Sequence, residues 1–244
     1  MVQLGVADGR QNARDMKADL AEVLRPARAV LFDFDGPICS VFAGSPAPDI
    51  ARQLHGQLAE IGVELPATDD PLDVLRLAAV FGHDVVLRIE ELLTAAEIAA
   101  VHSAAPTPGG EASIRACMAS GRLVAVVSNN SAAAVIAYLG QHAISPPSAD
   151  LVVGREYAKP HLMKPHPSPI LSVLALLDVT ADAAVLVGDT VTDIQAADAA
   201  GVACIGYANK PGKREQLDAA AAAVIDDMQV LADQLAALPY RTFG

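Results

Sequence analysis

The chain has 244 residues, of which 52% are hydrophobic, and it carries a formal net charge of −12. This length suits one α/β domain with a small second domain, and the negative charge excludes the phosphate backbone of nucleic acids as a general partner. Apolar stretches too short to span a bilayer predict no membrane partner, and three scattered cysteines without a disulfide or zinc pattern predict a reducing, cytoplasmic location.

Residues 1–25 are interpreted as an N-terminal extension that ends in a helix. Residues 1–14 are polar, and we expect them to be loosely ordered. Apolar side chains then recur at helical spacing over Asp15–Arg25, which predicts a helix that Pro26 ends. No apolar run follows the basic residues of this segment, so we expect no signal peptide.

A short apolar run that ends in two aspartates comes next. Val30–Phe34 has the composition of a buried strand, and Gly36 and Pro37 break it. Because strand side chains alternate between faces, Asp33 and Asp35 point the same way. Ligands bind beyond the carboxyl ends of strands in open parallel sheets, and two carboxylates this close require a cation beside them. We therefore expect a binding site here, with a simple polar turn as the alternative.

A helical block bracketed by two segments rich in proline and glycine follows this strand. Ser40–Asp49 and Ala105–Gly110 are interpreted as hinges. Between them the pattern is helical, and Thr94–Glu97 forms a capping box that predicts a fresh helix start. The expected helices are 49–62, 71–81, 83–93 and 94–104.

Strands and helices alternate through the rest of the chain. The expected strands are 123–127, 151–153, 185–187, 203–205 and 224–225. The expected helices are 111–120, 131–139, 169–177, 193–200, 215–222 and 228–238. This alternation predicts an α/β fold with a doubly wound parallel sheet. We assign this Rossmann-like core to residues 26–42 and 107–244, with residues 43–106 as an inserted all-helical cap domain.

A loop that could bind an anion follows the second strand of the predicted sheet. Ser128 and Asn129 stand between that strand and a helix, where exposed amides and a hydroxyl favour a negative charge. Ordinary capping of the helix by Asn130 or Ser131 is the alternative.

Carboxylates and one lysine complete the polar residues expected at this edge. Asp189 and Asp193 follow a later strand, and Lys164 lies in a proline-rich loop. Lys159, five residues earlier, is interpreted as a surface lysine. Together with the two acids of the first strand, Asp189 provides hard oxygen ligands suited to Mg²⁺, which also binds phosphate oxygens.

Four motifs in this order resemble those of the haloacid dehalogenase-like (HAD) hydrolase superfamily, over roughly residues 29–227. The DxDG motif is Asp33–Gly36, and the second motif is a hydrophobic strand that ends at Ser128. The third is Lys164 before a proline, and the fourth, GDxxxD, is Gly188–Asp193. The helical block lies between the first two motifs, where the phosphoglycolate phosphatase-like branch carries its cap.

The resemblance implies a catalytic role for several residues. Asp33 would attack phosphorus and form an aspartyl-phosphate. Asp35 would protonate the leaving oxygen and then deprotonate the attacking water. Ser128 and the amide of Asn129 would bind the phosphoryl oxygens, and Lys164 and Mg²⁺ would offset the negative charge of the crowded aspartates.

It also implies a metal site for Mg²⁺. The carboxylate of Asp33, the backbone carbonyl of Asp35 and the carboxylate of Asp189 would hold the ion. Asp193 would act beside the metal or orient its waters and the lysine.

These features predict a Mg²⁺-dependent phosphatase acting on a small phosphorylated metabolite. A phosphosugar mutase and a catalytically silent phosphate-binding protein are the alternatives. The absence of lysine between Gly36 and Ala158 disfavours a phosphonate hydrolase, and the acid at Asp35 disfavours a dehalogenase. Pro37 and Ser40 depart from the family pattern, which leaves the substrate subclass open, and no pattern indicates an oligomeric state. The cap residues that could face the substrate are Arg52, His55, Arg76, His83, Asp84 and Arg88.

Overall fold

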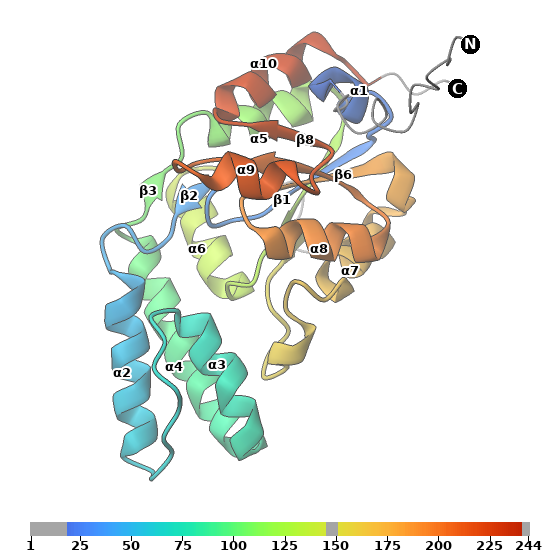
Figure 1. Ribbon diagram of the computed structural model, residues 1–244. Coiled ribbons are helices and arrows are strands. Elements are labelled where there is room, and N and C mark those ends of the chain that lie inside the picture. Colours follow the sequence, from blue (N-terminus) through green and yellow to red (C-terminus); the bar gives the residue numbers. More distant parts are fainter. Residues whose placement is uncertain (1–18, 145–150, 241–244) are drawn as a thin grey trace, which may run out of the picture.

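The computed structural model describes residues 19–144 and 151–240, and a six-stranded parallel sheet forms its centre (Figure 1). The strand order is β5-β4-β1-β6-β7-β8. The strands are β1 (Ala29–Phe32), β4 (Leu123–Val127), β5 (Val152–Val153), β6 (Ala184–Gly188), β7 (Ala203–Tyr207) and β8 (Ala223–Ile225). Every paired neighbour is parallel, which confirms the predicted sheet. The order also places β1 between β4 and β6, so their carboxyl ends lie together.

Helices cover both faces of this sheet because its central strand is apolar on both sides. Val30 and Phe32 of β1 pack into one core, whereas Leu31 packs into the other. The first core is covered by α1 (Leu20–Leu24), α5 (Gly110–Ala119), α6 (Ala132–Gln141) and α10 (Met228–Ala237). The second is covered by α7 (Ser168–Leu177), α8 (Val191–Ala200) and α9 (Lys213–Asp218). The fold is thus doubly wound, as the alternating pattern predicts.

A separate group of helices projects from the carboxyl edge of the sheet (Figure 1). It comprises α2 (Ala47–Ala59), α3 (Pro71–Ala78), the 3₁₀ turn Ala79–Phe81 and α4 (His83–Val101). These helices share their own apolar cluster, which includes Leu54, Leu75 and Ile89. They therefore form the helical cap that the sequence predicts.

The two predicted hinges pair with each other. Short strands β2 (Cys39–Ser40) and β3 (Ala105–Pro106) form an antiparallel ribbon, with Cys39 opposite Pro106. The chain leaves the sheet region and returns to it through this ribbon. We propose that the ribbon marks the boundary between cap and core, close to the limits expected from the sequence.

Several helix boundaries differ from expectation. The predicted helix start at Thr94 is wrong, because α4 runs unbroken through it. Thr94 and Glu97 have the residue types of a capping box, but their side chains bind Arg155 of the core instead. The helix expected over 131–139 extends through Gly140 to Gln141 in α6.

The N-terminal expectations can be compared only in part. Of the predicted helix, the described residues contain α1, which Asp19 and Glu22 begin with a capping box. The rest of that helix and residues 1–14 lie outside the described residues. Within the described part of the chain, no helix is both long and apolar enough to cross a membrane.

Candidate active site

The tip of β1 begins a cleft of about 950 Å³ between the sheet and the cap. The amide of Asp33 donates to the Val187 carbonyl of β6 at 2.8 Å, so Asp33 is held at the end of the sheet. The chain then turns sharply, and the amide of Val41 donates to Asp35 Oδ1 at 3.0 Å. Both aspartates line the cleft, as the alternation of the strand predicts.

Lys164 lies buried at the base of this cleft, between two carboxylates and a backbone carbonyl. Its Nζ is 2.8 Å from Asp33 Oδ1 and 2.5 Å from Asp193 Oδ1, and it donates to the Val127 carbonyl at 3.0 Å. The buried ammonium is therefore paired with two carboxylates and hydrogen-bonded to a backbone carbonyl. Although burial alone would lower the pKa of Lys164, the two carboxylates raise it, and the side chain stays charged.

Burial has the opposite effect on the neighbouring acids. It raises the pKa of Asp33 to about 8, even though the charge of Lys164 opposes this rise. Asp193 and Asp189 add to the rise by like-charge repulsion. Burial likewise raises the pKa of Asp35 to about 6. A further cation would therefore favour the ionised form of these carboxylates.

Three buried carboxylates form a group with the dimensions of a metal site. Oxygen atoms of Asp33, Asp189 and Asp193 lie within 4.8 Å of one another. Carboxylate oxygens are the ligands that Mg²⁺ prefers, so the donor set fits this ion. The side chain of Asp35 is not in the group, and in Asp193 both oxygens already bind Lys164 or Thr190.

Two glycines let these carboxylates approach the β1 tip. A Cβ on Gly36 would lie 2.5 Å from Cγ of Asp189, and Gly36 also has a φ of +109°, which disfavours side chains. A Cβ on Gly188 would lie 2.5 Å from Cβ of Asp193. The glycines of the DxDG and GDxxxD motifs are thus required by close packing.

The loop after β4 is hydrogen-bonded to the loop between β5 and α7 that carries Lys164, called here the lysine loop. The side chain of Asn129 accepts from the Lys164 amide at 2.8 Å and donates to the Lys164 carbonyl at 3.1 Å. Ser128 Oγ lines the cleft and accepts from the Asn130 amide at 3.1 Å. Ser131 caps α6 by accepting from Ala134, so the capping alternative holds for that residue.

Several residues of the site were not expected from the sequence. Asn209 Nδ2 donates to Asp189 Oδ2 at 2.9 Å, and Lys213 forms an ion pair with the same oxygen. Thr107 Oγ1 donates to the Gly36 carbonyl at 2.5 Å. A signal was present for Asn209, because it follows a parallel strand at the same edge, but the expected strand ended two residues before β7 does.

The cap contributes one of its six candidate residues to the cleft. Arg76 of α3 lines it, pairs with Asp73 at 2.7 Å and reaches the Lys164 carbonyl at 3.4 Å. The others, Arg52, His55, His83, Asp84 and Arg88, do not line it. Ser40 also lines the cleft, whereas Lys159 is an exposed residue paired with Glu156, as expected.

A doubly wound sheet with an acid cluster and a buried lysine at its carboxyl edge, beneath a helical cap, is an arrangement suited to phosphoryl transfer. Comparison with known proteins agrees with this interpretation of the site. Residues 69–207 match the family of haloacid dehalogenase-like hydrolases. The chain belongs to this family, and it is an enzyme of the hydrolase class.

Curated relatives extend the match over most of the chain. A plasmid-encoded phosphoglycolate phosphatase of Cupriavidus necator is 32% identical, over 87% of this chain and 94% of the relative. A phosphoglycolate phosphatase of Rhodospirillum rubrum is 29% identical, over 85% of this chain and 90% of the relative. Among solved structures, CbbY from Rhodobacter sphaeroides in complex with phosphate superposes with a TM-score of 0.58. It covers 84% of this chain and 96% of its own at 21% identity, which supports the fold alone.

Proposed function

We propose that this enzyme is a Mg²⁺-dependent phosphatase that hydrolyses a small phosphomonoester through an aspartyl-phosphate on Asp33. The observation that carries the proposal is the meeting of Asp33, Lys164 and Asp189 at one edge of the sheet. Phosphoryl transfer needs mainly positioning and charge neutralisation, and this arrangement supplies both.

Asp33 is the proposed nucleophile. Its carboxylate is fixed at the strand tip and contacts Lys164, which holds it in one orientation and lowers the cost of its charge. Attack on phosphorus would form an acyl phosphate on Asp33 and release the leaving oxygen as an alcohol once it gains a proton.

Asp35 is the proposed proton carrier. Its raised pKa of about 6 suits a group that gives a proton in one step and takes one in the next. Two neighbouring acids in different environments can divide the roles of nucleophile and acid–base in this way. Water activated by Asp35 would then hydrolyse the acyl phosphate and regenerate Asp33.

Mg²⁺ would be held by Asp33 and Asp189, with the Asp35 carbonyl as a further ligand. When bound, the ion supplies positive charge to the phosphoryl oxygens. We propose that Asp193 orients Lys164, since both its oxygens are engaged. Ser128 and the Asn129 amide are proposed to bind the remaining phosphoryl oxygens.

The proposed substrate is phosphoglycolate or another small phosphomonoester with a carboxylate on its leaving group. The activity named for the two curated relatives supports this choice. Arg76 supports it as well, because it is the cap cation that lines the cleft and a guanidinium binds carboxylates well.

A substrate screen tests the proposal. Phosphoglycolate, sugar phosphates, nucleoside monophosphates and p-nitrophenyl phosphate are assayed for released phosphate with Mg²⁺ or with EDTA. We expect Mg²⁺-dependent release, fastest from phosphoglycolate. A phosphosugar mutase would release little phosphate and need a bisphosphate activator, and a silent binding protein would release none.

A further inference from the structure

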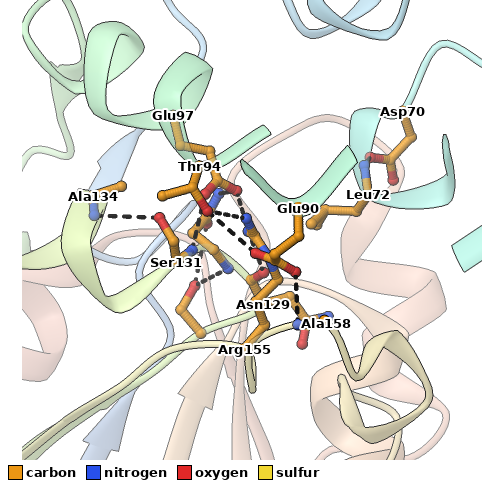
Figure 2. Close-up of polar contacts among 12 residues, drawn as sticks. Asp70, Leu72, Glu90, Thr94, Glu97, Asn129, Ser131, Ala134, Arg155 and Ala158 are labelled. Carbon is orange, nitrogen blue, oxygen red and sulfur yellow. Dashed lines mark hydrogen bonds and ion pairs between the residues drawn. The ribbon is translucent and has the colours of Figure 1, made fainter. Parts of the chain in front are cut away.

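A buried cluster of charged residues joins the cap to the core (Figure 2). Glu90 and Glu97 of α4 form ion pairs with Arg155 of the core at 2.7 and 2.6 Å. All three side chains are at most 2% exposed. Thr94, between the two glutamates on the helix, accepts from Arg155 Nη2 at 3.0 Å and donates to Glu90 at 3.2 Å. The guanidinium is thus hydrogen-bonded through each of its three nitrogens.

One side of the cluster ends on the phosphate-binding loop, defined here as residues 128–131. Glu97 Oε2 accepts from the Ser131 amide at 2.9 Å, and Glu97 Oε1 accepts from Asn130 Nδ2 at 3.1 Å. Arg155 Nη1 donates to the Asn129 carbonyl at 3.2 Å, and the backbone amide of Arg155 donates to the Asn130 carbonyl. Three consecutive residues of this loop therefore have a backbone group bound by Glu97 or Arg155, and neither of these residues lines the cleft.

The other side of the cluster reaches the segment that carries Lys164. Glu90 Oε2 accepts from the Ala158 amide at 3.4 Å. Ala158 and Met163 are buried in the apolar cluster of the cap, although they belong to the core's lysine loop. The cap helix α4 thus contacts both loops that would handle the phosphoryl group.

We propose that Glu97 and Arg155 are positioning residues, which set the phosphate-binding loop for the phosphoryl group from the cap side. Buried ion pairs are seldom the most stable choice for a core, because apolar residues of similar size can replace them without loss of stability. Here the charges end on backbone groups of a functional loop, which apolar side chains could not hold. This inference rests on the proposed phosphatase function.

The test compares Glu97→Gln with Glu91→Gln, a matched change at an exposed position of the same helix. Arg155 and the Ser131 amide bind different oxygens of Glu97, and glutamine replaces one of these oxygens with an NH2 donor, so one of the two contacts is lost. We expect Glu97→Gln to weaken competitive inhibition by inorganic phosphate about tenfold, as a small misplacement of a binding loop would. The Mg²⁺ concentration at half-maximal activity should stay within about twofold, because the proposed metal ligands lie on other loops. Glu91→Gln should match the wild type in both.

Other outcomes decide against the proposal. A folded Glu97→Gln protein, as judged by a cooperative thermal transition, with wild-type phosphate inhibition would overturn it, as would equal loss of phosphate and Mg²⁺ affinity. If Glu97→Gln does not fold, Thr94→Val replaces it and should weaken phosphate inhibition in the same selective way.

If the wild type hydrolyses no ester, the proposed function fails by itself. Calorimetric titration of phosphate into wild type and variant then still decides the positioning role.

Discussion

Lys164 Nζ lies 2.8 Å from Asp33 Oδ1, with both side chains nearly excluded from solvent. One residue ends the central strand and the other lies in a loop far along the chain. Lys164 follows β5, which lies two strands from β1 in the same parallel sheet, so the contact exists because the carboxyl ends of β1 and β5 meet at one edge. It gives the proposed nucleophile a fixed orientation and a neighbouring positive charge.

Removal of this ammonium should cost both stability and activity. In Lys164→Met, Asp33 and Asp193 lose their buried partner, and we expect the free energy of unfolding to fall by about 3–5 kcal/mol. Urea denaturation measures this loss. Lys159→Met, at an exposed neighbour of the same loop, should change stability by about 0.5 kcal/mol or less. Similar losses in the two variants would contradict the buried pairing.

Gly36→Ala should disturb the metal site beyond its backbone strain. The new Cβ would meet Asp189, so the Mg²⁺ concentration for half-maximal activity should rise, with a stability loss of about 1–3 kcal/mol. Gly82→Ala is the control, because Gly82 has a φ of +105° and open space around its Cβ position. Gly82→Ala should lose stability but keep the wild-type Mg²⁺ requirement. An unchanged Mg²⁺ requirement in Gly36→Ala would argue against a role for Asp189 in metal binding.

Stability without a divalent cation should decline as the pH rises. The folded-state pKa values of Asp33 and Asp35, about 8 and about 6, lie above the ordinary value near 4. The folded state therefore binds these protons more tightly, and its advantage is present below pH 4 and lost up to about pH 8. Urea unfolding in EDTA between pH 5 and 8 should show this decline, and Mg²⁺ should reduce it because it binds the ionised carboxylates. A flat or rising stability in EDTA would contradict the raised pKa values.

Arg76 should govern selection of the leaving group. Arg76→Ala should lower kcat/KM for phosphoglycolate about tenfold or more relative to p-nitrophenyl phosphate, which lacks the carboxylate. Arg88→Ala is the control, because Arg88 is a cap arginine that contacts Gln57 and Glu60 outside the cleft. Equal losses for both substrates would indicate that Arg76 acts on cap structure instead of recognising the carboxylate.

The sheet and its polar edge could be predicted because they depend on local patterns. Val30–Phe32 is an uninterrupted apolar run that ends at Asp33, and parallel topology then brings the carboxyl end of every strand to one edge. The convergence of strand ends also places Asp189 and Lys164 near Asp33, although the sequence gives none of the distances between them. The same reasoning does not find Asn209 because the strand expected over 203–205 ends two residues before β7 does.

The cap network could not be predicted because its residues carry a misleading local signal. Thr94 and Glu97 have the spacing of a capping box, and only the tertiary position of Arg155 reveals their use. Arg76 is likewise one of several cap cations until the placement of α3 brings it to the cleft. Tertiary contacts of this kind have no periodicity to detect.

Phosphate release by Asp33→Asn tests the central claim most directly. Asparagine keeps the shape of the side chain and can still accept from Lys164, but it is a far weaker nucleophile. With Mg²⁺ and p-nitrophenyl phosphate we expect kcat to fall about 10³-fold or more, whereas Asp198→Asn, at an exposed site on α8, should keep the wild-type rate. Turnover by Asp33→Asn within about tenfold of the wild type would contradict the assignment of Asp33 as the nucleophile.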